Sequence, residues 1–325
     1  MNRFIIKSIA YVCVIAVGAL LLDMMITHGL RAVESYTIKP WMDIRNGNME
    51  HDILIMGNSR AQDHIHPAIL DSMLGMSSYN LGTEAHHSDL HILKYHYYIR
   101  NNKKPRYIIY QVDLATFHPT RLKYSANNEQ FLPFFDDKYL RNEFVKYDYD
   151  RIDCILPLFR YFGNHTAIWW GIPKSLGLAK IDHLPEYKGF RMHKNDGNIE
   201  NAAGIFDIER IDMSNSFSRQ DSCLVRFENF LEECIVDSIK VLFVYTPIYS
   251  TVMSQLADKD EFDLYINDIS QKYDIPYIDY TLDDEFCSNP KYFASPGHLN
   301  YYGACTITKR IAYDIDSLMY LNKTK

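Results

Sequence analysis

The sequence predicts an α/β protein: a three-layer α/β/α sandwich with a central parallel sheet, preceded by an N-terminal transmembrane helix. Two observations predict the sandwich. Short apolar runs of β-forming residues alternate with segments of helical periodicity, and polar residues directly follow several of these runs. A third observation, an uncharged apolar stretch behind a basic N-terminus, predicts the transmembrane helix.

Residues 1–30 are predicted to anchor the chain in a membrane. Arg3 and Lys7 precede residues 8–22, which carry no charge, and Asp23 interrupts the stretch. A spanning helix needs about 20 apolar residues. Apolar residues before Lys7 extend the stretch, because a lysine side chain reaches the interface. The basic flank predicts that the rest of the chain lies outside the cytoplasm. A cleaved signal peptide is the alternative, but no convincing cleavage site follows.

The remainder is predicted to be a stem, residues 31–50, and one domain, residues 51–325. Of the 325 residues 47% are hydrophobic, enough for a substantial core. Residues 114–215 fit the core pattern poorly and are rich in aromatic side chains, so we interpret them as a large insertion with an exposed turn at 195–198. The net charge of −7, without a dense basic stripe, argues against a nucleic-acid partner.

The first predicted strand carries a candidate nucleophile at its end. Four apolar residues, Ile53–Met56, fit a buried strand of a parallel sheet. Gly57 and Asn58 tolerate the backbone angles of a sharp turn, and Pro67 opens a short helix. Ser59 therefore lies at the carboxyl end of a strand, where open α/β sheets place their sites. The alternative is that Ser59 merely caps a helix.

Two further blocks have the same strand-to-helix organisation. The block Tyr79-Asn80-Leu81-Gly82 follows Ser77-Ser78 and precedes a helical pattern starting near Ser88. The Gly82 N–H would serve in an oxyanion hole shaped by Asn80, or the block is an ordinary turn. Residues 107–113 form a run of β-formers that ends in Asp113. Asp113 either lines the cleft or caps the next segment.

The core pattern resumes after the insertion. It predicts a helix at about 217–235, a strand at 241–245, a surface helix at 256–273 and a last strand at 276–279. His298 then lies in a turn-rich loop before a final helix, whose apolar residues recur at helical spacing up to Leu318. A histidine that the fold brings beside Ser59 would act as its base.

In this order the blocks resemble the SGNH (GDSL-like) hydrolase superfamily over about residues 50–115 and 238–320. The matching motifs are Gly57-Asn58-Ser59-Arg60, Asn80-Leu81-Gly82 and His298-Leu299-Asn300 followed by Gly303-Ala304. The chain looks most like the membrane-anchored bacterial branch, which includes the alginate O-acetylation proteins and the D-alanine transfer protein of teichoic acids. That likeness implies a single-pass protein of the bacterial cell membrane with a periplasmic or otherwise extracytoplasmic domain.

The resemblance also implies roles for particular residues. Ser59 and His298 would be catalytic, and the backbone of Ser59 and Gly82, with Asn80, would bind the oxyanion. The candidate cleft residues are Asn58, Arg60, Asp113 and Asn300. No cofactor is expected.

One position departs from the family pattern. An aspartate usually stands three residues before the histidine and orients its ring, but here that residue is Ser295. Three interpretations stay open: a Ser–His dyad, a triad completed by another acid such as Asp279 or Asp283, or a fold kept for binding alone. In a well-studied protease, losing the orienting carboxylate costs about 10⁴ in turnover.

The resemblance implies a membrane-anchored serine esterase or O-acyltransferase acting on a cell-surface or exported glycan. Its substrates would be an acylated glycan or an acyl donor. A multipass membrane acyltransferase is a candidate partner, because anchored relatives work beside such proteins. The alternative is a catalytically impaired glycan-binding or assembly subunit.

A weaker alternative is a metal-dependent phosphoesterase. His87 and His91 are four residues apart and would share a helix face, with His64 and His66 as further candidates. No second cluster at metal-ligand spacing is evident, so no metal is expected.

Overall fold

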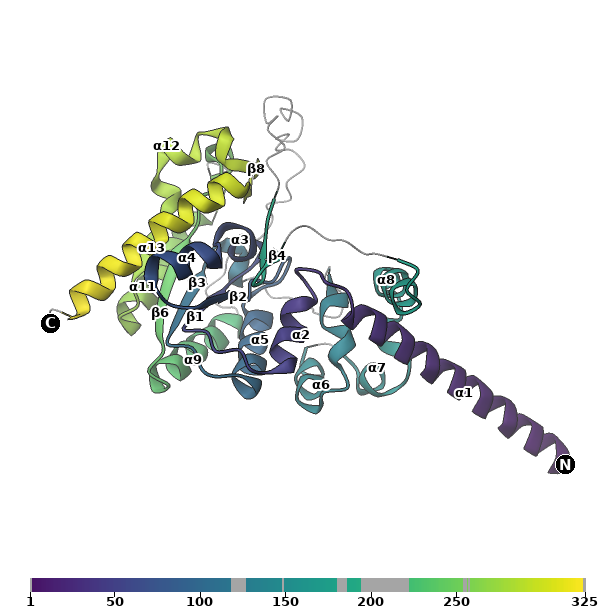
Figure 1. Cartoon of the computed structure of the whole chain (residues 1–325). Coiled ribbons are helices and arrows are strands. Elements are labelled where there is room, and N and C mark those ends of the chain that lie inside the picture. The colour runs from purple at the N-terminus through teal and green to yellow at the C-terminus, as the bar shows by residue number, and fades with distance from the viewer. Residues whose placement is uncertain are drawn as a thin grey trace. The chain divides into compact units, whose positions relative to one another are not determined.

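The computed structural model describes residues 2–117, 127–147, 149–179, 186–193, 222–253, 256 and 258–323. The predicted turn at 195–198 and the start of the helix predicted at 217 lie outside these ranges. The chain divides into two compact units. The smaller unit comprises Met1–Met42 and Arg121–His183, and the larger unit comprises Asp43–Thr120 and Leu184–Lys325. Figure 1 shows the chain coloured from the N-terminus to the C-terminus. The boundaries expected at residues 30 and 50 stay predictions.

The larger unit is built around a parallel sheet of five strands. In spatial order these are β2 (Ser78–Asn80), β1 (Ile53–Met56), β3 (Tyr107–Gln111), β6 (Lys240–Tyr245) and β7 (Tyr277–Asp279). Every neighbouring pair is parallel. The predicted α/β class with a central parallel sheet is confirmed, and the carboxyl ends of all five strands meet at one edge.

Helices cover both faces of this sheet and complete the three layers. One face carries α3 (Ser59–His64), α4 (Pro67–Leu74) and α13 (Tyr301–Lys323); the other carries α5 (Ser88–Asn101), α9 (Ser222–Val236) and α11 (Lys259–Tyr273). Ile55 and Ile109 pack into a core with Ile307 of α13. Tyr110, the next residue along β3, packs instead against Phe227 of α9. The two-residue period of the strands thus divides their side chains between the layers.

Shorter elements complete the larger unit. They are η1 (Leu114–Phe117), the hairpin β4 (Glu186–Tyr187) and β5 (Phe190–Arg191), α10 (Ser250–Met253), η8 (Tyr280–Leu282), α12 (Asp284–Cys287), η9 (Pro290–Tyr292), and the hairpin β8 (Phe293–Ser295) and β9 (His298–Leu299).

The smaller unit is helical. It contains α1 (Asn2–Arg31), the start of α2 (Lys39–Asn46), η3 (Asn128–Gln130), η4 (Leu132–Phe134), α6 (Lys138–Phe144), α7 (Arg151–Ile155), η5 (Phe159–Tyr161) and α8 (His165–Ser175). Trp41 stacks on Phe134, and Phe131 stacks on Phe144. Much of the aromatic segment predicted as an insertion therefore forms a core with the N-terminal residues.

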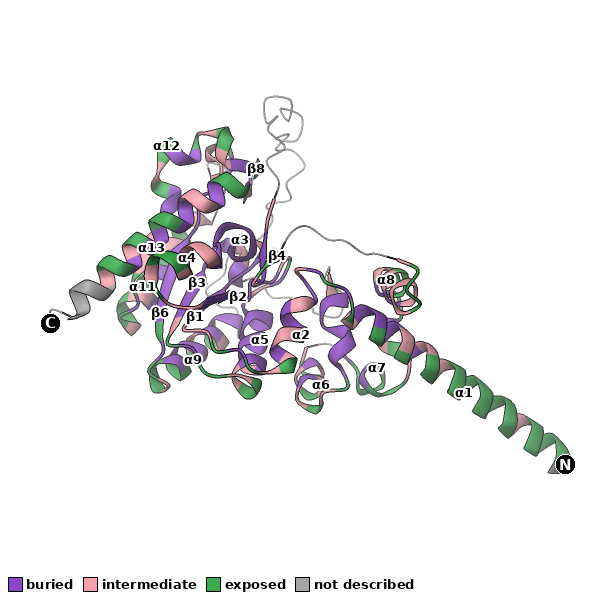
Figure 2. Cartoon of the chain, in the orientation of Figure 1, coloured by how far each residue is buried: buried purple, intermediate pink, exposed green. Residues whose placement is uncertain are grey.

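Helix α1 has two parts with different surroundings. From residue 3 to residue 21 nearly every side chain is exposed, whereas Asp23, Ile26 and Leu30 are buried (Figure 2). The helix Arg3–Arg31 contains an 18-residue stretch with a mean hydropathy of 2.4 and is long and apolar enough to cross a membrane. Length and composition alone support this, and a signal sequence has the same properties.

Candidate active site

Ser59 sits on a sharp turn between β1 and α3. Gly57 has a φ of +137°, and a Cβ there would lie 2.8 Å from the Gln111 carbonyl oxygen, so this position needs glycine. Asn58 caps α3 by accepting a hydrogen bond from the Arg60 N–H at 2.9 Å. Ser59 is then the first residue of α3. The predicted turn is confirmed, but the sequence did not predict a helix starting at Ser59.

His298 lies beside Ser59, as predicted. The Ser59 Oγ and the His298 Nε2 are 2.8 Å apart. On the other side of the ring, the Ser295 Oγ lies 3.2 Å from Nδ1. Ser295 and His298 belong to the paired strands β8 and β9, so one hairpin holds the imidazole and its hydroxyl partner. The ring is thus held between two serine hydroxyls.

The surroundings of His298 keep its imidazole neutral. Although a third of the side chain stays accessible, protein groups surround the ring. This burial lowers the pKa of His298 to about 4, and the positive charges of Arg60 and Arg191 act in the same direction. The carboxylate of Asp63 opposes them without reversing the effect. At neutral pH the ring therefore has a lone pair with which to accept a proton.

Asp63 is a site residue that the sequence analysis missed. It lies on α3 four residues after Ser59, hence on the same helix face, and is buried. Its Oδ2 is 4.0 Å from the His298 Nε2. A prediction of α3 would have revealed this spacing.

The side chains of Arg191 and His193 hold the Asp63 carboxylate. Arg191 of β5 donates from Nε to Oδ1 at 2.7 Å and from Nη2 to Oδ2 at 2.5 Å. His193 Nε2 lies 2.9 Å from Oδ2. Burial alone would raise the pKa of Asp63, but the hydrogen bonds from His193 and Arg191 hold it well below the usual range. Asp63 is therefore a fixed negative charge beside the histidine.

Neither acid proposed as a partner of His298 fills that role. Asp279 accepts hydrogen bonds from Thr281 and pairs with Lys259. Asp283 caps α12 and pairs with Arg310. The prediction of Asp279 or Asp283 is thus wrong, because each carboxylate is bound elsewhere. Ser295, three residues before His298, is the residue that contacts the ring at Nδ1.

A hydrogen-bonded group next to Ser59, which we call the support, consists of Asn58, Arg60 and Asp113. Asp113 is buried and accepts hydrogen bonds from Asn58 Nδ2, at 2.8 and 3.0 Å, and from Arg60 Nη1, at 2.9 Å. Burial opposes its ionisation, yet the Arg60 charge and these hydrogen bonds lower the pKa of Asp113. Arg60 Nε also donates to the Gly297 carbonyl at 3.2 Å, which ties the histidine loop to this support. Asp113 lies beneath the site and does not line an open cleft.

The predicted oxyanion donors need correction. The Asn80 Nδ2 donates to the carbonyls of Ala61 and Ile65, at 2.7 and 2.9 Å. The Gly82 N–H donates to the Asn80 Oδ1 at 2.9 Å. Both donors are thus used to fasten the turn after β2 to α3. The Ser59 N–H, in contrast, has no acceptor among the residues that the structure describes, and it stays a candidate donor.

Asn300 also has a structural position. Its Oδ1 accepts from the Gly303 N–H at 2.9 Å, and its Nδ2 donates to the carbonyls of Lys291 and Phe293. The residue is buried and caps α13. The prediction that Asn300 lines the cleft is therefore wrong.

The histidines that suggested a metal make hydrogen bonds within the fold. His91 contacts the Tyr110 hydroxyl and the His86 carbonyl, and His64 contacts the Thr246 hydroxyl and the Leu299 N–H. Within the described ranges, no three His, Cys, Asp or Glu side chains are grouped as metal ligands.

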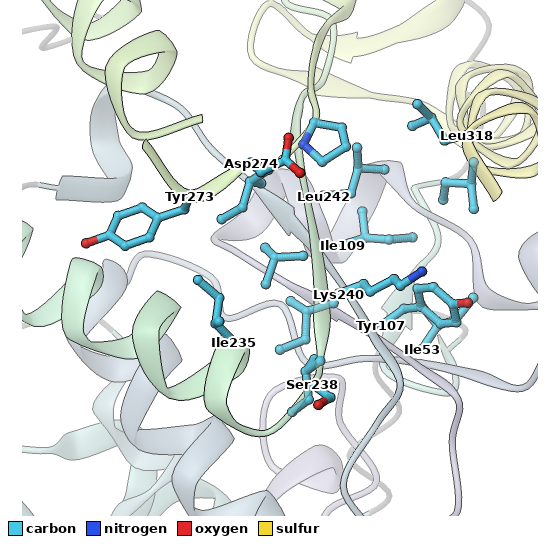
Figure 3. A pocket seen from close by; sticks show the side chains of 16 residues that line it. Ile53, Tyr107, Ile109, Ile235, Ser238, Lys240, Leu242, Tyr273, Asp274 and Leu318 are labelled. Atoms are coloured by element: carbon cyan, nitrogen blue, oxygen red, sulfur yellow. The ribbon is translucent and has the colours of Figure 1, made fainter. Parts of the chain in front are cut away.

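A hollow of about 740 Å³ lies at the other end of the sheet (Figure 3). Ile53, Tyr107 and Lys240, the first residues of β1, β3 and β6, line it together with Ile315 and Leu318 of α13. Ser59 and His298 are not among its lining residues. The chemistry and this hollow therefore occupy opposite ends of the strands.

No protein-family model and no curated protein matches this chain. Among solved structures, it is similar to a Bacteroides fragilis protein provisionally described as an acylhydrolase, with 13% identity and a TM-score of 0.41. The likeness covers 83% of this chain and 89% of that chain. At that TM-score, the candidate site rests on its own geometry.

Proposed function

We propose that this protein is a serine acyl hydrolase or O-acyltransferase anchored in a membrane by α1. The observation that carries the proposal is the 2.8 Å contact between the Ser59 Oγ and the Nε2 of a neutral His298. Both groups lie at the carboxyl edge of a parallel sheet, where such folds place their sites. The mechanism below needs no cofactor.

In the first half-reaction, the Ser59 Oγ attacks the carbonyl carbon of an ester while His298 Nε2 takes the hydroxyl proton. The Ser59 N–H would donate to the oxygen that becomes negative. The bond to the leaving alcohol then breaks, and His298 returns the proton to that alcohol. Ser59 is left carrying the acyl group.

In the second half-reaction, water or a sugar hydroxyl attacks the acyl carbon. His298 takes the proton of the attacking group, the bond to Ser59 Oγ breaks, and the proton returns to the serine. Water as the acceptor gives hydrolysis, and a sugar hydroxyl gives transfer. We favour transfer to an exported glycan, with a multipass membrane acyltransferase as acyl supplier, because of the resemblance to anchored acetylation proteins.

Three charged groups change the stability of the His298 imidazolium that forms in these steps. The Asp63 carboxylate, 4.0 Å from Nε2, stabilises it, whereas Arg60 and Arg191 destabilise it. The balance favours a short-lived imidazolium that readily gives its proton to the leaving group. Ser295 contributes orientation through Nδ1 but no charge.

Labelling by a fluorophosphonate, which reacts with activated serines, tests the proposal. The full-length chain should be labelled, and it should hydrolyse a small acetyl ester. Ser59→Ala should lose both properties. The control is Ser72→Ala, which alters an exposed serine on α4 and should keep both. A wild-type chain that is unlabelled and inactive on every acyl ester would overturn the proposal.

A second candidate function is a glycan-binding or assembly subunit. The observation that favours it is Ser295, because a hydroxyl contacts His298 Nδ1 where the family pattern has a carboxylate. A chain that binds acetylated polysaccharide without any acyl chemistry, and whose binding survives Ser59→Ala, would support this alternative.

A further inference from the structure

Besides the exposed apolar residues of α1, a second group of exposed apolar side chains lies in the smaller unit. Phe162 is 93% exposed, Leu178 is 76% exposed and Trp169 is 74% exposed. We call the full set the apolar strip: Ile152, Ile155, Leu156, Phe159, Phe162, Ile168, Trp169, Leu176 and Leu178. It runs along α7, η5 and α8, and both helices contact η5. Such a concentration marks a surface that contacts a partner or a membrane, since isolated apolar residues are the norm elsewhere.

Helix α8 has two apolar faces, and α1 covers one of them. Gly171 lies so close to α1 that a Cβ there would be 2.6 Å from the Ile26 carbonyl oxygen. A Cβ at Gly29 would likewise meet the Gly171 carbonyl oxygen. Ile168, Trp169 and Leu176, spaced to share another face of the helix, are exposed. The second face therefore points away from the α1 contact.

The strip begins where the apolar part of α1 ends. Residues 4–22 carry one charge, Lys7, and at 1.5 Å per residue they extend about 28 Å, close to the ~30 Å core of a bilayer. Asp23 follows and is buried against η5. It accepts hydrogen bonds from the Leu158 N–H at 2.9 Å and from Arg160 Nη2 at 2.5 Å. These contacts fix η5 at the end of the apolar stretch.

We propose that the apolar strip lies in the interfacial layer of the membrane that α1 spans. The inference rests on the proposed membrane anchor, but not on the proposed chemistry. The apolar strip contacts lipid, because it begins where the apolar residues of the spanning segment of α1 end. Tryptophan and phenylalanine suit that depth, and amphipathic helices bind there with their apolar faces buried. Arg151 and Lys174 lie within the same segment, where they would meet lipid headgroups.

Tryptophan fluorescence in vesicles tests the proposal. The chain has three tryptophans; Trp41 is fully buried and Trp170 is half-buried, so Trp169 is the one most open to lipid. The full-length chain is reconstituted into vesicles of phosphatidylethanolamine and phosphatidylglycerol that contain brominated phosphatidylcholine. The bromines should quench the emission, and Trp169→Phe should abolish most of that quenching. Trp170→Phe, one residue away on the same helix, is the matched control and should keep it.

A second variant pair keeps Trp169 in place. Ile168→Gln with Leu176→Gln should weaken the quenching, because the face no longer enters the apolar layer. Val225→Gln with Leu264→Gln alters exposed apolar residues of α9 and α11 in the larger unit and should leave it unchanged.

Flotation with the vesicles separates the two ways to fail. A chain that does not float would overturn both the anchor and the strip, whereas fluorophosphonate labelling still reports on Ser59. A chain that floats, yet shows equal quenching with and without Trp169, would overturn the strip alone. The apolar side chains would then face a protein partner, since these vesicles contain no other protein.

Discussion

The two edges of the parallel sheet differ in what they offer a ligand. At the carboxyl edge, the His298 Nε2 lies 2.8 Å from the Ser59 Oγ and 4.0 Å from the Asp63 Oδ2. The positive charges of Arg60 and Arg191 lower the pKa of His298 there. At the amino edge, the hollow of about 740 Å³ is lined mainly by aliphatic side chains. This hollow thus lies at one end of the strands, and the reactive groups lie at the other. Paired charges beside a nucleophile mark the candidate site better than this hollow does.

His298→Ala should have the largest effect. Without its base, Ser59 loses the group that accepts its proton, which costs roughly 10³-fold in kcat/KM on an acetyl ester. His96→Ala, which alters a histidine of α5 paired with Glu233, is the control and should retain the wild-type rate. Equal rates in the two variants would mean that the carboxyl edge is not the chemical one.

Asp63→Asn should cost roughly tenfold to a hundredfold, because the imidazolium loses a negative charge 4.0 Å away. A pH profile separates this role from a structural one. Since the pKa of His298 is about 4, the wild-type rate should stay level on acidification and fall only as the pH passes through that value. Because the Asp63 carboxylate raises the pKa of His298, Asp63→Asn should shift the acidic loss of activity to lower pH. Thermal unfolding of the same variant reports the cost of removing the Asp63 charge from Arg191, which keeps its ion pair with Glu84. A lower melting temperature with an unmoved pH profile would show that Asp63 only supports the fold.

Ser295→Asp should have a smaller effect of opposite sign. A carboxylate at Nδ1 would stabilise the imidazolium and raise the pKa of His298, so the acid limb should move to higher pH. We expect a gain of about tenfold in kcat, less than the 10⁴ quoted for losing such a group in a protease, because Ser295 already orients the ring. Ser295→Asn, which adds a side chain of similar size without charge, should show neither change.

Ile53→Ala at the amino edge should leave kcat/KM almost unchanged. Ile53 is buried in the core and lines the hollow, so its truncation should lower the free energy of unfolding by about 2–5 kcal/mol. Urea denaturation measures this, with Val225→Ala on the exposed side of α9 as the reference. A loss of activity as large as that of Asp63→Asn would remove the distinction between the edges.

The sequence predicted the parts of the site that depend on local pattern and strand ends. The motifs around Ser59 and His298 are short and weak alone. Their order along the chain, their placement after predicted strands and their resemblance to a known family predict the pair, because parallel strands bring their ends together. Asp63 was missed because α3 has no apolar periodicity; its sequence is Ser-Arg-Ala-Gln-Asp-His. Its six residues are too few for a pattern to emerge.

The errors at Asn80 and Gly82 have another cause. A backbone N–H or an asparagine amide looks the same in sequence whatever acceptor it meets, and here the acceptors are the Asn80 side chain and two carbonyls around α3. The aromatic segment was similarly ambiguous. Stacking of Trp41 on Phe134 joins residues far apart in the chain, and composition alone does not reveal such partners.

The two-part character of α1 has a practical consequence for anyone who wants a soluble form of this protein. The customary cut, just after the apolar stretch is complete at about residue 30, would remove Ile26 and Thr27, which contact Gly171 and Tyr161. Such a product would lose the buried end of α1 together with its exposed apolar turns. A cut just before Asp23 discards the exposed apolar turns of α1 and keeps the Asp23–Arg160 pair intact. Crystallisation trials should start from that shorter deletion.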